Sequence, residues 1–99
     1  MTRLAGKAAV VVGAGQTPGD TIGNGRATAL LFAREGARVL CVDRNAARAE
    51  ETAALIAAEG GTARPFAANI MREAECQALV AAAVAAFGRI DILHNNVGG

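Results

Sequence analysis

The fold is decided by residues 8–25, which read AAVVVGAGQTPGDTIGNG. The uninterrupted apolar run at its start is typical of a strand buried on both faces of a parallel sheet. The glycines that follow let the backbone turn sharply and pass close to a ligand, because glycine adopts positive φ without strain. A helix that begins directly after such a turn points its free N–H groups at an anion. The stretch therefore predicts a strand, a turn and a helix that together bind a phosphate group.

Strands and helices alternate along the rest of the chain. The predicted strands are residues 7–12, 38–42, 62–68 and 90–94, and the predicted helices are residues 24–35, 45–59 and 72–87. Asn45 is placed to cap the second helix. Pro65 suits an edge strand, since proline cannot donate to a hydrogen-bond ladder.

Right-handed crossovers between parallel strands put the helices on both faces of the sheet. We therefore expect residues 1–99 to form one α/β domain, a Rossmann-like doubly wound parallel sheet. It is truncated to four strands in the order 3-2-1-4 with three helices, just over half of a complete dinucleotide-binding fold.

Helical periodicity predicts which side of each helix faces the sheet. The expected inward residues are Ala27, Leu30 and Leu31 in the first helix, Ala49, Ala53 and Ile56 in the second, and Cys76, Leu79, Val80, Ala83, Val84 and Phe87 in the third.

Composition narrows the class of protein. The 99 residues carry a formal net charge of +1, which suggests neither a nucleic-acid nor a membrane-surface partner. No apolar stretch approaches the roughly 18 residues that a membrane span needs. Cys41 and Cys76 lack a metal-ligand spacing, so we expect no metal site and two reduced core thiols in a cytoplasmic protein.

Asp43 ends the second predicted strand, 20 residues after Gly23. An acid at about this distance from a glycine-rich turn binds the ribose of a dinucleotide. Its carboxylate accepts hydrogen bonds from both ribose hydroxyls and repels a 2′-phosphate. Arg44 is the opposing signal, because an arginine nearby accommodates that phosphate. We favour NAD over NADP, and the alternative for Asp43 is a helix-capping or solvent-facing acid.

Several segments together resemble the short-chain dehydrogenase/reductase family, and the resemblance covers the whole chain. They are residues 11–15, 23–27, 32–39, 42–44 and 87–98. The closing Asn95-Asn96-Val97-Gly98 is similar to the specific Asn-Asn-Ala-Gly segment of that family. The resemblance implies a cofactor site made of Gly13, Gly15, Gly23, Asn24, Gly25, Asp43, Arg44, Asn69, Ile70, Asn95, Asn96, Val97 and Gly98. Of these, Gly13, Gly23 and Gly25 would form the pyrophosphate turn, Asn69 and Ile70 would border the adenine, and the last four would line the middle of the cofactor.

The glycine spacing departs from the family pattern. Nine residues separate Gly13 from Gly23, where three are usual. A rival register uses Gly19, Gly23 and Gly25, which restores the usual spacing. We prefer Gly13 because it directly follows the strand.

Three further positions differ from the family. Asn69 stands where an acid is expected, so an acceptor is kept and a charge is lost. Val97 replaces an alanine. Met71 stands where a serine or threonine commonly caps the next helix, which leaves the start of that helix less defined.

The chain contains no Ser and no Tyr, and Lys7 is its only lysine. In the family that it resembles, a Tyr is the acid/base, a Lys lowers the pKa of that Tyr and a Ser orients the substrate, all beyond the Asn-Asn-Ala-Gly segment. We therefore expect no catalytic residue in these 99 residues. The resemblance implies that they are the N-terminal part of an NAD(P)-dependent oxidoreductase that acts on alcohols or carbonyls. The 99 residues alone are expected to be inactive and marginally folded. His94 reads as a core or edge histidine with no catalytic role.

Two other functions stay open. The chain is alternatively a non-catalytic dinucleotide-binding module or a degenerate gene product. A Rossmann methyltransferase also carries glycines after its first strand and an acid after its second, but Asn95-Asn96-Val97-Gly98 counts against it. No Gly-Lys-Ser/Thr follows the glycines, which disfavours a P-loop phosphotransferase.

Overall fold

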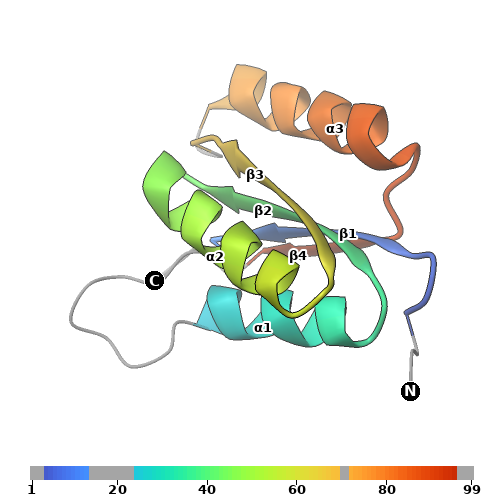
Figure 1. Cartoon of the computed structure of the whole chain (residues 1–99). Helices are drawn as coiled ribbons and strands as arrows, with labels where there is room; N and C mark the ends of the chain where they lie inside the picture. Colours follow the sequence, from blue (N-terminus) through green and yellow to red (C-terminus); the bar gives the residue numbers. More distant parts are fainter. Residues whose placement is uncertain (1–3, 14–23, 70–71, 96–99) are drawn as a thin grey trace.

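The computed structural model describes residues 4–13, 24–69 and 72–95. In these ranges four strands alternate with three helices (Figure 1). The elements are β1 (Ala8–Val12), α1 (Asn24–Arg34), β2 (Arg38–Asp43), α2 (Ala46–Ala58), β3 (Thr62–Ala67), α3 (Glu73–Phe87) and β4 (Ile92–Asn95). The predicted alternation is confirmed, although β4 begins two residues later than expected and β2 extends to Asp43.

The strands form one parallel sheet in the order β3-β2-β1-β4, as predicted. Val12 of β1 lies opposite Val42 of β2 on one side and Asn95 of β4 on the other. Pro65 lies in β3, which is an edge strand, and pairs with Cys41. The edge position is the one that its missing N–H allows.

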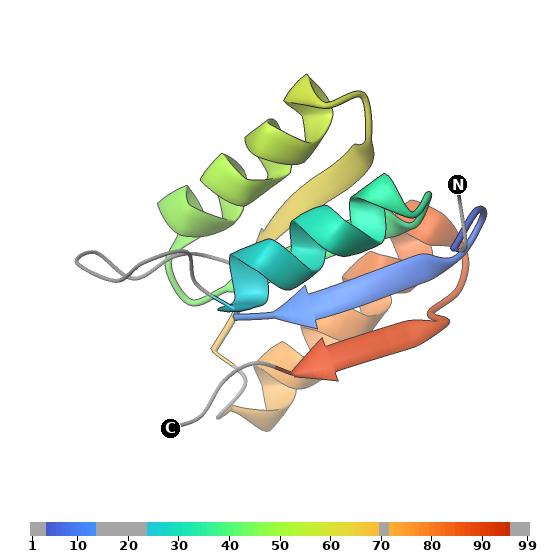
Figure 2. The same cartoon turned by 90° about the horizontal axis from the view of Figure 1, so that it is seen from below.

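Helices cover both faces of the sheet, which makes the fold doubly wound. Figure 2 shows α1 and α2 on one face and α3 on the other. The side chains of β1 alternate between two hydrophobic clusters: Val10 packs with Leu79 and Phe87 of α3, and Val11 packs with Ala29 of α1 and Ile56 of α2. Such alternation is what the period-2 geometry of a strand requires when both faces are buried.

The inward face of α1 differs from the prediction. Ala29 is fully buried, whereas Leu31 is 54% exposed and Ala27 is exposed. The helix turns its small residues toward the sheet, with Gly25 also buried one turn before Ala29. Leu30 is half-buried and packs against the cluster around Ala29, so its predicted inward position is confirmed.

The inward face of α3 is narrower than expected. The buried residues of this helix are Leu79, Ala83 and Phe87, which recur every four residues. Val80 and Val84 are 50% and 47% exposed, so their predicted burial is wrong. From Ala78 onward the helix contains only apolar residues, and periodicity therefore cannot choose the stripe that packs on the sheet.

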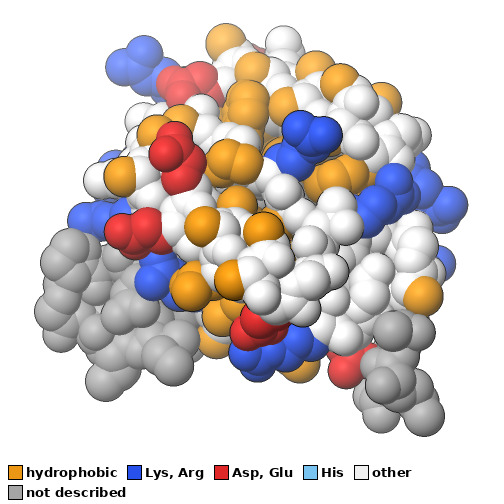
Figure 3. Space-filling model, in the orientation of Figure 1, with side chains coloured by type: hydrophobic (Ala, Val, Ile, Leu, Met, Phe, Trp, Pro, Cys, Tyr) orange, Lys and Arg blue, Asp and Glu red, His pale blue; other side chains and the backbone are white. Residues whose placement is uncertain are grey.

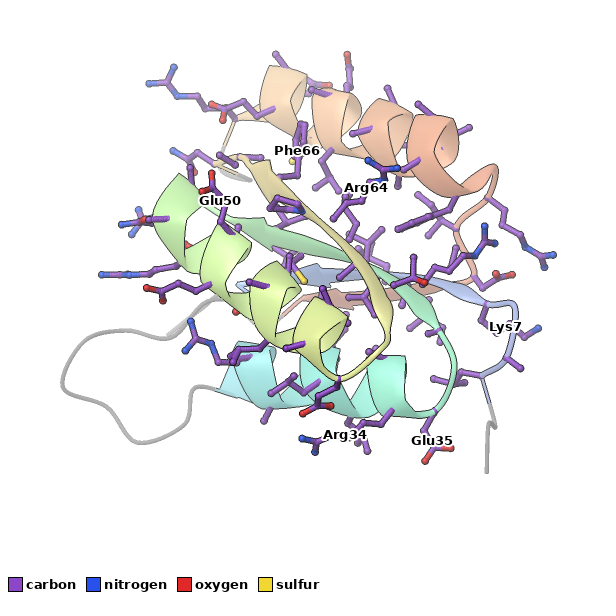
Figure 4. All side chains as sticks on the ribbon, in the orientation of Figure 1. Lys7, Arg34, Glu35, Glu50, Arg64 and Phe66 are labelled. Carbon is purple, nitrogen blue, oxygen red and sulfur yellow. The ribbon has the colours of Figure 1, made fainter. Side chains whose placement is uncertain are left out.

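The α3 side of β4 is only partly covered. Leu93 is 65% exposed, while Ile92 and His94, its neighbours along the strand, are half-buried. Figure 3 shows hydrophobic side chains spread over α2 and α3, interspersed with charged ones. In Figure 4, Phe66 of β3 points toward α3, where it packs against the cluster around Leu79. None of the helices in the described ranges is long and apolar enough to cross a bilayer.

Candidate dinucleotide site at the carboxyl edge of the sheet

The carboxyl ends of the four parallel strands meet at one edge of the sheet. In Figure 2 the arrows of β1 and β4 point to this edge, and α1 and α2 both begin beside it. Gly13, Asp43 and Asn69 follow or end β1, β2 and β3 there. The carboxyl edge is where ligands bind in open α/β sheets.

Gly13 turns the chain immediately after β1. Its φ of 76° lies in the left-handed region, which glycine reaches without steric cost. Its N–H donates to the carbonyl oxygen of Val42 at 2.7 Å, which ties the turn to the end of β2. Gly25 is buried in the first turn of α1, and this turn contains no acidic residue. The positive end of the α1 dipole is therefore not offset by a carboxylate of its own first turn.

Asp43 is half-buried at the end of β2, and a local hydrogen bond orients it. Its Oδ1 accepts the backbone N–H of Asn45 at 2.9 Å. Asn45 in turn caps α2, since its Oδ1 accepts the backbone N–H of Arg48 at 3.2 Å. The predicted cap is confirmed. A carboxylate has about four acceptor positions, so the contact with Asn45 is compatible with additional bonds from ribose hydroxyls. Arg44 is exposed beside it.

Asn69 is held in place by a residue that the sequence did not indicate. Its backbone N–H donates to Oε1 of Glu75 at 2.7 Å, and the preceding Ala68 N–H donates to the carbonyl oxygen of Asp43 at 3.0 Å. Arg72 is the N-cap of α3 and makes no side-chain capping bond. The cap position is therefore Arg72, one residue later than the position 71 that the sequence suggested, and Glu75 secures the turn that precedes it.

A second group that sequence reasoning missed connects α1 to α2. Arg26 donates from Nε to Oγ1 of Thr52 at 3.0 Å and from Nη2 to Oε1 of Glu51 at 3.0 Å. Neither helix pattern predicts this contact, because it depends on how the two helices lie side by side. The available signal was Thr52 itself, a polar residue on the side of α2 that Ala49, Ala53 and Ile56 bury.

His94 is half-buried in β4 and packs against an aromatic ring of α1. Its ring meets that of Phe32 in α1 edge to face, with the centroids 6.2 Å apart. This is the packing role that we expected for it. No group of three or more potential metal ligands occurs within the ranges 4–13, 24–69 and 72–95.

Part of the predicted site lies outside the described residues. This part comprises Gly15, Gly23, Ile70, Asn96, Val97 and Gly98, together with Gly19 of the rival register. Asn24 begins α1 and Asn95 ends β4, so the backbones of both reach the carboxyl edge. The described structure thus brings Gly13, Asn24, Gly25, Asp43, Arg44, Asn69 and Asn95 to one edge.

Proteins of known family share this architecture. A family model described as short chain dehydrogenase matches residues 7–99. An uncharacterized oxidoreductase of Mycobacterium tuberculosis is 40% identical over 99 residues, which are 100% of this chain and 35% of that protein. A crystal structure described as a short-chain dehydrogenase/reductase from Burkholderia xenovorans is 47% identical with a TM-score of 0.92, covering 100% of this chain and 39% of that one.

Two other solved relatives contain dinucleotides. A 7α-hydroxysteroid dehydrogenase complexed with NADH and 7-oxo glycochenodeoxycholic acid is 39% identical, with a TM-score of 0.90 over 99% of this chain and 36% of that one. A metagenomic short-chain oxidoreductase in complex with NADP is 33% identical, with a TM-score of 0.86 over 97% of this chain and 41% of that one. The chain therefore spans between 35% and 41% of the length of these proteins. The family match and the superposition of the whole sheet establish that this chain belongs to the short-chain dehydrogenase/reductase family.

Proposed function

We propose that the chain is the cofactor-binding part of a nicotinamide-dependent oxidoreductase that interconverts alcohols and carbonyls. The observation that carries the proposal is the convergence of Gly13, the first turn of α1 and Asp43 on one edge of the sheet. In this arrangement the N–H groups at the start of α1 bind the diphosphate. Asp43, oriented by Asn45, accepts hydrogen bonds from the adenosine ribose.

The remaining residues of the proposed site have supporting roles. Asn69, held through Glu75, borders the adenine together with Ile70. Gly15 and Gly23 belong to the diphosphate turn, and Asn96, Val97 and Gly98 continue the site beyond Asn95. A bound nicotinamide dinucleotide would supply the hydride.

NAD is the cofactor that we propose, in preference to NADP. Asp43 is half-buried at the strand end and fixed by the turn, whereas Arg44 is exposed next to it. A fixed carboxylate at the ribose repels a 2′-phosphate, whereas the attraction of the exposed Arg44 side chain for that phosphate is screened by water. The solved relatives contain NADH in one case and NADP in another, so the preference for NAD rests on Asp43 and Arg44 of this chain.

In the short-chain dehydrogenase/reductase family a Tyr is the acid/base and a Ser orients the substrate, and these 99 residues include no Tyr and no Ser. We propose that the acid–base residues and the substrate site belong to further parts of the enzyme. The alternative is a non-catalytic dinucleotide-binding module. A downstream coding sequence with a Ser followed by Tyr-x-x-x-Lys favours the enzyme, and its absence from a complete message favours the module. We also propose a cytoplasmic location, where cysteines such as Cys41 and Cys76, which are not joined in a disulfide, stay reduced.

Calorimetric titration with NAD and NADP tests the site. We expect NAD to bind more tightly than NADP, and Asp43→Ala to weaken NAD at least about tenfold, in keeping with lost charge-assisted hydrogen bonds. Glu50→Ala is the matched control, because Glu50 is an exposed acid on α2 (Figure 4). A folded chain that gives no heat with either dinucleotide, or an Asp43→Ala variant that binds NAD like the parent, contradicts the proposal.

A further inference from the structure

The contact between Arg26 and Thr52 is unusual in its burial. Thr52 has an exposed fraction of 0%, and among the described residues it is the only polar residue that is buried. The Arg26 side chain is 14% exposed. A buried hydroxyl and a nearly buried guanidinium lose much of their contact with water, so each needs a partner inside the protein. The 3.0 Å bond from Arg26 Nε to Thr52 Oγ1 supplies one.

The position of Arg26 within α1 does not explain why a positively charged residue stands there. It lies in the first turn of α1, where a positive charge opposes the helix dipole. The α1 dipole therefore gives no reason for a positive charge here, and the described structure joins the Arg26 guanidinium to Thr52 and Glu51 on α2.

A second pair ties the same two helices at their other ends. Arg34 donates to both carboxylate oxygens of Glu59, at 2.9 and 2.8 Å. Arg34 and Glu59 are 25 positions apart, the same separation as Arg26 and Glu51, so the two links are in register along parallel helices. The side chains of Arg34 and Glu59 are 59% and 42% exposed, and such surface pairs add little stability. Only the buried link lies in the turn of α1 that meets the carboxyl edge.

The two helices join the two halves of the proposed site. Gly25 and Arg26 share the first turn of α1, which faces the diphosphate, and α2 follows Asp43 through the Asn45 cap. A shift of α1 along α2 would therefore change the distance between the diphosphate turn and the ribose acid. We propose that Arg26 and Thr52 are positioning residues that hold these two subsites at the separation a dinucleotide requires. This inference rests on the proposed function.

Arg26 has a competing role, as a positive charge that attracts the diphosphate directly. Thr52→Val separates the two roles. It removes the acceptor of the Arg26 Nε–H with little change in side-chain shape, and it keeps the positive charge. If Arg26 acts only through its charge, Thr52→Val leaves NAD binding unchanged or strengthens it. If the pair fixes the spacing, the same change weakens NAD.

The experiment compares two ligands in the full 99-residue chain. NAD spans both subsites, whereas adenosine reaches only the ribose subsite, and amide chemical shifts follow the binding of each. We expect Thr52→Val to weaken NAD about tenfold, since positioning errors of this kind act on every contact of a bridging ligand. Adenosine should change less than about twofold, and Thr52→Ser, which restores the acceptor, should bind NAD within about twofold of the parent.

Arg34→Gln is the matched control, because it breaks the link at the far ends of the same helices. We expect it to leave the affinity for NAD unchanged. All titrations are run at a temperature where circular dichroism shows the variant to be as folded as the parent. Should Thr52→Val not fold at any such temperature, Arg26→Lys tests the same link, since lysine keeps the charge but lacks the fork of donors.

The other outcomes overturn either the proposed function or the inference about Arg26 and Thr52. A folded parent that does not bind NAD overturns the proposed function and the inference with it. A parent that binds NAD and a Thr52→Val variant that binds it equally well overturn the inference alone. Equal weakening of adenosine and NAD, or weakening by Arg34→Gln, shows a general loss of structure and also overturns it.

Discussion

The carboxylate of Asp91 binds the first residue of β1: its Oδ2 accepts the backbone N–H of Ala8 at 2.8 Å. The Asp91 N–H donates to the Ala8 carbonyl oxygen, also at 2.8 Å, and the residues are 83 positions apart. Arg89 donates to the other carboxylate oxygen from Nε and Nη2. These contacts join the amino ends of β1 and β4. The Ala8 N–H, and next the Arg89 guanidinium, hold the pKa of Asp91 below its ordinary value of 3.8.

This pKa shift makes the stability of the chain dependent on pH. Because the carboxylate is favoured in the folded state, its stabilising effect is present above pH 3.8 and is lost as the pH falls through the lower folded-state pKa. We expect Asp91→Asn to lower the free energy of unfolding at neutral pH and to have a smaller effect in acid. Urea titrations across this range measure both. A Glu50→Gln control should follow the parent at every pH, and a constant difference between parent and Asp91→Asn would refute the assignment.

The two cysteines should differ in reactivity. Burial raises the pKa of the Cys41 thiol to about 12, so almost no reactive thiolate is present at pH 8. Cys76 is only half-buried. We expect iodoacetamide to label Cys76 first and Cys41 only when the sheet opens, as followed by mass spectrometry. In Cys76→Ala the fast phase should vanish. Rapid labelling of Cys41 in the native chain would contradict its place in the core.

A side chain at Gly61 is expected to destabilise the fold. A Cβ at this position would lie 2.7 Å from Cγ2 and 3.3 Å from the carbonyl oxygen of Ile56. Gly61→Ala should therefore cost about 1–3 kcal/mol, the range for overpacking a filled core. Gly60 is the matched control: its φ is +86°, but no atom lies within 4 Å of a Cβ built there. Gly60→Ala should cost only the backbone strain of about 1–2 kcal/mol. In a double-mutant comparison of the free energy of unfolding, Gly61→Ala should cost less in an Ile56→Ala background than in the parent. The cost of Gly60→Ala should be the same in both backgrounds.

Two neighbouring residues of α2 should differ in their contribution to stability. Ile56 is 0% exposed and packs against β1 and β2, whereas Leu55 is 43% exposed. Ile56→Ala should destabilise the chain by about 2–5 kcal/mol through lost burial and a cavity. Leu55→Ala should change the free energy of unfolding by about 0.5 kcal/mol. Equal losses in chemical denaturation would show that α2 does not pack on the sheet as described.

Local patterns predicted the fold because each of them acts over short distances. The apolar run ending at Gly13 formed a buried strand and a left-handed turn. Asn45 capped α2, and Pro65 fell on an edge strand. Of the candidate site, Gly13 and Asp43 were indicated by their places at the ends of predicted strands and Gly25 by the family resemblance, and the structure brings the three to one edge.

Long-range packing decided what those patterns could not reach. The alanine-rich helices are apolar on several sides, so their sequences do not show which side faces the sheet. The way the helices pack on the sheet determined that Ala29 is buried and that Leu31, Val80 and Val84 are exposed. The contact of Asn69 with Glu75 depended on the path of the turn into α3. The sequence by itself therefore determined the order of elements and the edge of the sheet where we propose that a dinucleotide binds, because hydrophobic period and turn chemistry are local. Only the tertiary structure decided that Arg26 meets Thr52 and that Asp91 meets Ala8, because such contacts exist only after helices and strands distant in the chain lie side by side.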